Sequence, residues 1–330
     1  MASDDTDTVF SRAFGLAAPI VQGPMGGISG PKLVAAVAEA GALGVLPIWC
    51  HRIDDVKSNI AATQAATKRP FAVNVRADLV QQEHIACALG FGVSIFHLFW
   101  GDPSASIRRI RGHGARIIAT VSDGDTAKAA LDAGAEALIA QGVEAGGHVF
   151  GSMPLVDLLE LVLDLAGSIP VVAGGGIADG DDVIEALDRG AAGALLGTRF
   201  AATHESEAHG IYKQALTAAD GQDTVRTTLF DIGWPEAPHR VLRNSTFRAW
   251  QAAGRPASGD RPGAREIVAR IGEAMEYPRY HAASANMAME GDIEAMALYS
   301  GMGVGKVTEI RSARQIIDEI KLSIRSRAPL

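Results

Sequence analysis

Eight short apolar runs divide roughly the first 200 residues of the chain, and each is followed by a stretch whose apolar residues have helical spacing. The runs are nearly continuous, as in strands buried on both faces, and do not alternate with polar residues. We therefore expect eight buried parallel strands. The runs span residues 19–24, 41–47, 70–75, 93–99, 115–121, 135–142, 170–176 and 193–200.

The stretches between these runs carry helix signals. Asp or Ser lies near their starts, and Gly41, Gly134 and Gly190 follow their ends. Eight regular strand–helix units predict an α/β protein with a closed (β/α)8 TIM barrel over residues 1–220. An open doubly wound sheet is the competing arrangement, but the regular pattern without a switch favours the barrel. The clearest helical stretches are 32–40, 125–133, 155–166 and 181–190.

The alternation of strand and helix patterns ends at about residue 220, and the chain then becomes rich in Pro, Gly and Arg. We expect residues 221–291 to form a smaller, mostly helical lobe on the substrate side of the barrel, with a helix over 267–275. Helical spacing over 292–307 and 312–326 predicts two further helices. These would return to the barrel and close its ring of helices, so that residues 292–326 belong to the barrel domain.

Composition excludes several function classes. Of the 330 residues, 48% are apolar and 21% charged, which is typical of a soluble globular protein. The net charge is −8 and there is no block of Lys or Arg, which argues against a nucleic-acid surface. The apolar runs are far shorter than the roughly 20 residues of a membrane helix. The start of the chain lacks a signal peptide pattern, and its two cysteines suit a reducing compartment, so we expect a cytoplasmic protein.

The active site of a barrel of this type lies at the carboxyl ends of the strands. Predicted strands seven and eight end in glycine clusters, Gly174–Gly176 and Gly197-Thr198. Bare backbone N–H groups next to a helix start can bind an anion, so we expect a phosphate group there. Glycines can also serve only to pack a strand tightly against a helix. That explanation is weaker for two adjacent clusters at the expected end.

A phosphate site without a dinucleotide fingerprint or a Walker motif indicates a flavin mononucleotide or a sugar phosphate. Asn74 and Gln141, at the ends of two strands, can hydrogen-bond the polar edge of an isoalloxazine ring. Gly23, Pro24 and Met25 can let such a ring lie flat over backbone. Without flavin, the same barrel would suit a phosphate-binding lyase or isomerase, and that alternative stays open. His204 and His209 lack a third ligand at metal spacing, so no metal site is expected.

Several motifs, taken in order, resemble the nitronate monooxygenase family, formerly called 2-nitropropane dioxygenase. They are QGPMGG (22–27), AEAGALG (38–44), FAVNV (71–75), QGVEAGGH (141–148), VVAGGGIADG (171–180) and GTRF (197–200). The resemblance covers about residues 12–220 and implies His148 as the active-site histidine. It implies FMN contacts, including those of the phosphate, at Gly23, Pro24, Met25, Asn74, Gln141, Gly146, Gly175, Gly176, Gly197 and Thr198.

The resemblance implies FMN-dependent oxidation of alkyl nitronates by O2 to carbonyl compounds and nitrite, with neutral nitroalkanes as a further substrate. An imidazole titrates near neutrality, so His148 can remove a proton next to a nitro group or stabilise an anion. Thr120 stands where some relatives have a lysine, and Met302 where Gln is frequent, which affects the substrate more than the cofactor. The alternative is an NAD(P)H-dependent FMN reductase of quinones or enoyl thioesters. The expected partners are a small-molecule substrate and O2, and a homodimer is compatible with the sequence.

Overall fold

Eight parallel strands form a closed ring in the computed structural model, which describes residues 6–326. The hydrogen-bonded order is β1-β9-β8-β6-β5-β4-β3-β2, and a bridge between Val21 and Leu43 joins the two ends. The buried side chain of Gln22 strengthens this seam, because its Oε1 accepts a hydrogen bond from the Val45 N–H at 3.0 Å. The predicted TIM barrel is therefore confirmed over the open sheet. The strands are β1 (Ile20–Gln22), β2 (Gly44–Pro47), β3 (Phe71–Arg76), β4 (Ile95–Phe99), β5 (Arg116–Val121), β6 (Ala137–Gln141), β8 (Val171–Gly174) and β9 (Gly193–Leu196).

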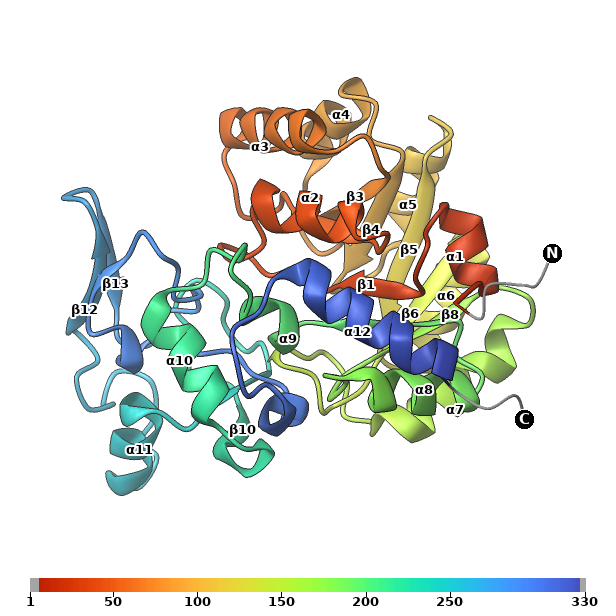
Figure 1. The fold of residues 1–330 in the computed structure, drawn as a ribbon. Coiled ribbons are helices and arrows are strands. Elements are labelled where there is room, and N and C mark those ends of the chain that lie inside the picture. Colours follow the sequence, from red (N-terminus) through yellow and green to blue (C-terminus); the bar gives the residue numbers. More distant parts are fainter. Residues whose placement is uncertain (1–5, 327–330) are drawn as a thin grey trace.

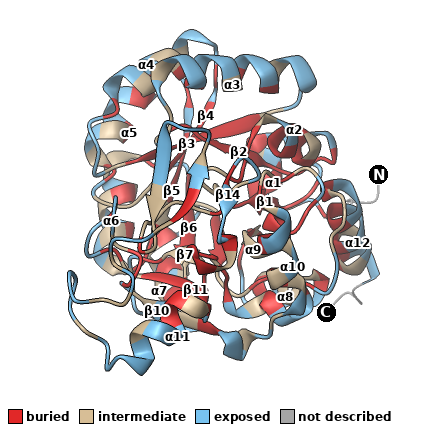
Figure 2. Ribbon diagram, turned by 90° about the vertical axis from the view of Figure 1, so that its left-hand side faces the viewer, coloured by how far each residue is buried: buried red, intermediate tan, exposed pale blue. Residues whose placement is uncertain are grey.

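A ring of helices surrounds these strands (Figure 1). Their inner faces are buried against the sheet, and their outer faces are exposed (Figure 2). The last helix, α12, packs against both α8 and α2 and so takes the eighth place in the ring, as predicted for residues 312–326. The helices are α2 (Pro31–Glu39), α3 (Ile53–Ala66), α4 (Gln82–Gly90), α5 (Ser104–Arg111), α6 (Gly124–Ala133), α7 (Leu155–Ala166), α8 (Gly180–Asp188) and α12 (Ala313–Ser326).

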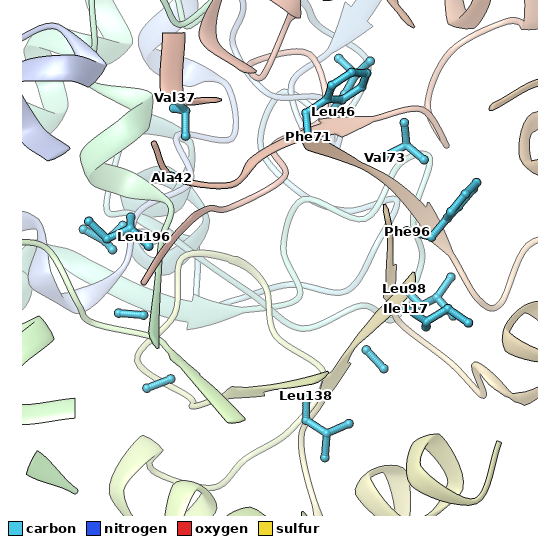
Figure 3. Packing of buried hydrophobic residues seen from close by; sticks show 14 of the residues in the cluster. Val37, Ala42, Leu46, Phe71, Val73, Phe96, Leu98, Ile117, Leu138 and Leu196 are labelled. Atoms are coloured by element: carbon cyan, nitrogen blue, oxygen red, sulfur yellow. The ribbon is translucent and has the colours of Figure 1, made fainter. Parts of the chain in front are cut away.

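Two apolar layers hold the barrel together. The larger layer lies between strands and helices and includes Val37, Phe71, Phe96 and Leu138 (Figure 3). The smaller layer fills the interior of the ring. Burial of this much apolar surface is the main favourable term in folding, so the barrel has the core it needs to present its strand ends rigidly.

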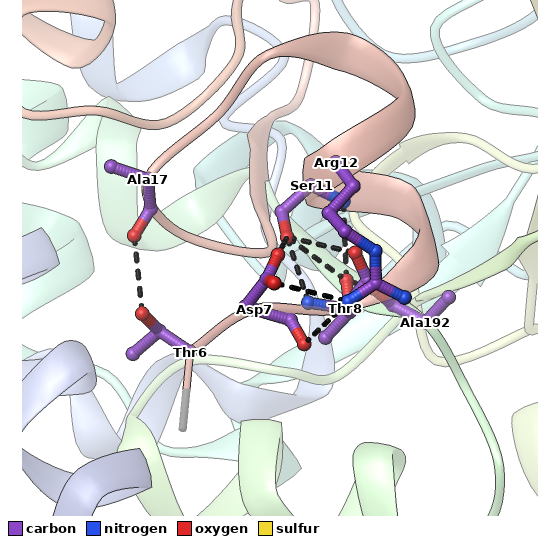
Figure 4. A network of polar contacts seen from close by, with 7 residues as sticks. All are labelled: Thr6, Asp7, Thr8, Ser11, Arg12, Ala17 and Ala192. Carbon is purple, nitrogen blue, oxygen red and sulfur yellow. Dashed lines mark hydrogen bonds and ion pairs between the residues drawn. The ribbon is translucent and has the colours of Figure 1, made fainter. Parts of the chain in front are cut away.

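A short N-terminal helix, α1 (Val9–Phe14), closes one end of the barrel. Its Phe10 and Phe14 are buried in the interior layer, with ring centroids 4.9 Å apart. Thr8 caps the helix and also donates a hydrogen bond from Oγ1 to the Ala192 carbonyl, at 2.6 Å, just before β9 (Figure 4). This plug leaves the opposite end, where the strands terminate, as the open end.

The lobe is formed by the chain that follows β9 together with the short strand β7, and it contains strands as well as helices, which corrects the expectation of a mostly helical lobe. One sheet has the order β10-β11-β7 and the other β13-β12-β14. Figure 1 shows this part of the chain beside the open end of the barrel. Its elements are α9 (Thr198–Ala201), α10 (Gly210–Ala218), α11 (Ser245–Ala252), β7 (Gly147–His148), β10 (Thr224–Thr227), β11 (His239–Leu242), β12 (Ile267–Ile271), β13 (Met275–Pro278) and β14 (Glu290–Gly291), with 3-10 turns at Gly221–Asp223, Ile293–Ala295 and Met302–Lys306.

The helix predicted over 267–275 is wrong, because this segment forms β12 and the turn into β13. Its apolar spacing fits a helix, but Ile267, Val268 and Ile271 are β-branched and favour a strand. Gly272 then adopts φ +57°, a left-handed conformation that suits a hairpin turn.

The helix predicted over 292–307 is also wrong. Two 3-10 turns flank extended chain there, and this chain bridges to Ser284 through Ala297 and to Val241 through Tyr299. Of the two helices expected to close the barrel, only α12 does so.

Two features of the described chain concern membrane helices and cysteines. Within residues 6–326, no helix is both long and apolar enough to cross a membrane. The cysteines are free thiols, with Cys50 exposed and Cys87 half-buried.

Candidate active site

A cavity of about 620 Å³ opens at the carboxyl ends of the barrel strands, between the barrel and the lobe. This volume lies in the range typical of sites for cofactors and small ligands. The structure brings all the predicted site residues to its walls, although they come from five separate stretches of the chain. The residues are Gly23, Pro24, Met25, Asn74, Gln141, Gly146, His148, Gly175, Gly176, Gly197 and Thr198.

Glycine backbone forms one side of the cavity. Gly175 and Gly176, directly after β8, have φ of +127° and +74°, which side chains rarely allow. Gly197 differs, because a Cβ placed there would meet no atom within 4 Å. Since Gly197 lines the cavity, that open space is the space available to a ligand. The two clusters thus present bare backbone, as an anion site at a strand end requires.

A segment near the end of the chain completes this side. A Cβ on Gly146 would lie 2.4 Å from the Gly301 nitrogen, so the two backbones touch. The Gly301 N–H also donates a hydrogen bond to Thr198 Oγ1 at 2.9 Å. Gly303 packs equally closely on the Gly176 carbonyl. Gly301 and Gly303 were missed because the sequence pattern assigned them to the end of a helix.

Polar side chains from four adjacent strands, β3 to β6, line the floor of the cavity. Asn74 and His97 are buried, and His97 Nε2 lies 2.7 Å from Thr120 Oγ1. Gln141, on the next strand, donates from Nε2 to the His148 carbonyl at 3.3 Å. Its Oε1 is buried and has no hydrogen-bond partner among the described residues. An orphaned buried acceptor is costly, so this oxygen is suited to a donor on a bound ligand.

His148 lies on β7, a two-residue strand that pairs with β11 of the lobe. Its Nε2 is buried and lacks a hydrogen-bond partner within residues 6–326. Burial lowers the pKa of this imidazole well below its ordinary value, and the charges of His239 and Arg76 act in the same direction. His148 is therefore neutral at neutral pH and has a ring nitrogen free for a substrate.

Aromatic side chains surround His148. The Trp234 ring stacks on it with centroids 3.8 Å apart, and Trp100 and Tyr299 approach at 5.9 and 5.4 Å. Phe150 lies against Trp100, at 5.2 Å. From the sequence, Trp100, Trp234 and Tyr299 could form an apolar wall over a flavin or belong to the interface core, and the structure places them around this imidazole. The surroundings are apolar, which is what keeps the ring neutral.

Arg76 supports the wall of the cavity from behind Trp234, and the sequence pattern did not indicate it. Its guanidinium carbon lies 3.3 Å from the centroid of the Trp234 ring, while Nε donates to Asp78 Oδ1 at 3.0 Å. Trp234 is thus in contact with Arg76 and with His148. The available signal was a charged pair at the carboxyl end of a barrel strand, with Arg76 as the last residue of β3 and Asp78 just after it.

Other residues have structural roles or complete the wall. Glu144 accepts a hydrogen bond at Oε2 from the Leu155 N–H, 3.0 Å away, at the start of α7. His209 accepts one at Nδ1 from the Ile211 N–H and caps α10. Met275 and Tyr277 on β13, and His281 just after it, also line the cavity, and they were missed because this hairpin was not predicted.

These features fit the group that the family resemblance implied. Gln141 Oε1 needs a donor, the floor is polar, and the glycine side leaves open space at Gly197. Asn74, Thr120 and Gln141 could hold the polar edge of a flavin ring. Gly175, Gly176, Gly197 and Thr198 could hold its phosphate.

The barrel and its site define an oxidoreductase of a known class. The nitronate monooxygenase family model matches residues 8–90 and 80–322, and the chain belongs to that family. A nitronate monooxygenase of Pseudomonas aeruginosa is 28% identical over 94% of this chain and 99% of its own length. A (3aS,4S,5R,7aS)-5-hydroxy-7a-methyl-1-oxo-octahydro-1H-indene-4-carboxyl-CoA dehydrogenase of Mycobacterium tuberculosis is 32% identical over 96% of this chain and 95% of its own.

Solved structures agree with this assignment. FabK from Thermotoga maritima superimposes with a TM-score of 0.81, at 29% identity over 97% of this chain and 96% of that one. Nitroalkane oxidase from Streptomyces ansochromogenes gives a TM-score of 0.77, at 31% identity over 96% of this chain and 97% of that one. The chain is therefore similar to proteins whose names refer to nitronate, nitroalkane and CoA-linked chemistry.

Proposed function

We propose that the protein binds FMN in this cavity and oxidises alkyl nitronates with O2, giving carbonyl compounds and nitrite. Bound FMN would supply the redox chemistry, taking up electrons from the substrate and passing them to O2. The protein's own residues bind the cofactor, exclude water and place the substrate. Neutral nitroalkanes would be a further substrate if a base in the site removes the proton from the carbon next to the nitro group.

The observation that carries this proposal is the state of His148. It is a neutral imidazole in an apolar enclosure, and its buried Nε2 has no hydrogen-bond partner among the described residues. If the ring proton is on Nδ1, Nε2 can accept a proton from the carbon next to a nitro group. If it is on Nε2, the same atom can donate to the oxygen of a nitronate. Both roles need a ring nitrogen that the protein itself does not occupy.

Cofactor binding is tested first at Gly197. A side chain there fits the backbone, because φ is −105° and no protein atom lies within 4 Å, but it projects into the cavity. We expect Gly197→Val to fold normally and to lose most of its bound FMN. Gly210→Val is the matched control, since Gly210 also has free space around it and does not line the cavity. Full FMN occupancy in Gly197→Val would show that the phosphate lies elsewhere.

Gly176 is less informative. Its φ of +74° makes any side chain strained, so loss of FMN there would not separate misfolding from a blocked site. Gly197 is the sharper test for that reason.

The source of electrons is tested by anaerobic mixing. We expect an alkyl nitronate to reduce the bound FMN readily, and NADH or NADPH to reduce it slowly or not at all. The flavin absorbance around the visible maximum reports both reactions. Rapid reduction by a nicotinamide, at a rate that matches turnover, would contradict the proposal.

That outcome would favour a second candidate, an NAD(P)H-linked oxidoreductase of thioesters or quinones. The specific observation in its favour is the Mycobacterium tuberculosis CoA-linked dehydrogenase, which aligns over nearly the whole of both chains. Turnover assays with an enoyl thioester and with a quinone separate the two forms of this candidate.

The role of His148 is tested by comparing two forms of one substrate. A pre-formed nitronate has already lost its proton, whereas the neutral nitroalkane needs a base, and a positioned base contributes ~10²- to 10⁴-fold. If His148 is that base, His148→Asn should lose most activity on the nitroalkane and keep more on the nitronate, with FMN still bound. If it only holds the anion, the nitronate reaction should fall at least as much. Unchanged kinetics on both forms would remove His148 from the mechanism.

A further inference from the structure

A chain of three hydrogen-bonding side chains crosses the cavity floor, from Asn74 on β3 through His97 on β4 to Thr120 on β5. Asn74 Nδ2 donates to the His97 carbonyl at 3.1 Å. A carbonyl can only accept, so this contact fixes which end of the Asn74 amide is the nitrogen. The same Nδ2 lies 3.3 Å from His97 Nδ1 and has a second hydrogen available for it.

The direction of the chain follows from these contacts. Because Nδ1 of His97 accepts from Asn74, the proton of the neutral ring is on Nε2. Burial lowers the pKa of His97 to about 3, so the ring carries a single proton at neutral pH. Nε2 then donates to Thr120 Oγ1, 2.7 Å away. The hydroxyl hydrogen of Thr120 must therefore point elsewhere, and Thr120 lines the cavity.

We infer that His97 is a positioning residue that fixes the Thr120 hydroxyl as a hydrogen-bond donor into the cavity, directed at the ring of bound FMN. This inference rests on the proposed FMN site. The orphaned acceptor Gln141 Oε1 lies on the next strand, β6. A donor and an acceptor on neighbouring strands match the polar edge of an isoalloxazine, where carbonyl and N–H groups alternate.

The donor has a consequence for the cofactor. A reduced flavin ring carries more negative charge than an oxidised one, and hydrogen bonds to charged acceptors are roughly twice as strong as neutral ones. The Thr120 hydroxyl should therefore stabilise reduced FMN more than oxidised FMN.

The test measures the FMN reduction potential and the dissociation constant of oxidised FMN. Thr120→Val has nearly the same shape and lacks the hydroxyl. We expect reduced FMN to bind about tenfold more weakly relative to oxidised FMN, a shift of about 30 mV to more negative potential. Thr120→Ser keeps the hydroxyl and should restore the wild-type potential. Ser122→Ala is the matched control, because it removes a hydroxyl next to β5 that does not line the cavity.

His97 is tested in the same way and in combination. Asparagine at position 97 is too short to reach Thr120, so His97→Asn should shift the potential in the same direction as Thr120→Val. In the Thr120→Val background it should add no further shift, because His97 acts through that hydroxyl. An equal shift in both backgrounds would show that His97 acts on the flavin independently. If His97→Asn fails to fold, the two Thr120 variants still decide whether the donor exists.

The outcomes separate this inference from the proposed function. If the wild-type protein binds no FMN, both are overturned. If it binds FMN and Thr120→Val has an unchanged potential, the inference is overturned and the FMN site stands. A shift in Thr120→Val that Thr120→Ser does not reverse would assign the effect to packing and would also overturn the inference.

Discussion

Buried imidazoles make the fold sensitive to acid, and the size of the effect can be worked out for two of them, His97 and His239. Burial lowers the pKa of His97 to about 3 and that of His239 to about 4. His239 donates from Nδ1 to the Ala237 carbonyl and accepts at Nε2 from the Phe230 N–H, so protonation of Nε2 would also break a hydrogen bond. Both rings resist protonation in the folded protein and accept it freely in the unfolded chain.

The sign and size of the effect follow from proton linkage. Above pH 6.5 both rings are neutral in the folded and unfolded states, and they do not affect the pH dependence. Below pH 6.5 the unfolded chain binds protons that the folded protein refuses, so the free energy of unfolding falls as the pH falls. Each ring contributes ~1.4 kcal/mol per pH unit in this range, or ~2 kcal/mol lost between pH 7 and pH 5. Together they remove ~4 kcal/mol of a total stability of typically 5–15 kcal/mol.

The assay is urea unfolding of wild type and His97→Asn at pH 7 and at pH 5, with the same FMN content in every sample. The variant should be less stable at pH 7 and should lose ~2 kcal/mol less than wild type on moving to pH 5. His113→Asn, which removes an exposed histidine, is the control for the substitution. An identical loss in wild type and His97→Asn would refute the reasoning. It would mean that His97 binds protons equally well in the folded and the unfolded protein.

Three further predictions concern the N-terminal helix α1 and the aromatic side chains around His148. Phe10→Ala should lower the free energy of unfolding by ~3–5 kcal/mol, measured by urea titration, because the ring is fully buried in the barrel interior. Thr8→Ala should cost ~1 kcal/mol through loss of the helix cap, in the same assay. Trp234→Ala should raise the pKa of His148 towards its ordinary value, measured by NMR titration, because it opens the apolar face of the imidazole to water. An unchanged His148 titration would assign its neutrality to other contacts.

The barrel could be predicted from the sequence because its strands are short and fully buried. Runs such as residues 70–75 and 115–121 are short and mostly apolar, and each is followed by a helix pattern, so run length and the repeated strand–helix alternation together separate strand from helix. Strand ends then locate the open face, because parallel strands in a closed ring all terminate on one side. That geometry is why residues from distant stretches, such as Gly23 and Gly197, could be placed in one site before the structure was known.

The lobe could not be predicted in the same way. The segment around β12 has apolar residues at spacings that suit a helix and a half-buried strand equally, and only its pairing with β13 decides between them. Residues 296–300 depend on isolated bridges to distant chain, which leave no periodic trace. Arg76 and its contact with Trp234 likewise join residues far apart in sequence. Such contacts depend on tertiary packing, and periodicity does not encode it.

The position of α12 in the ring of helices has a consequence for how the protein is made. Most of the lobe lies between β9 and α12 in the sequence, so the helix that covers the gap between α8 and α2 is synthesised after the lobe. Domains generally fold as synthesis proceeds from the N-terminus, yet this barrel cannot bury the facing sides of α2 and α8 until the lobe and α12 have been synthesised. The gap is filled by the buried side chains of α12, so this part of the barrel core forms late. These side chains are Ile316, Ile317, Ile320 and Ile324. A chain that lacks α12 would expose an apolar stripe on the barrel, and we expect it to bind chaperones and to aggregate.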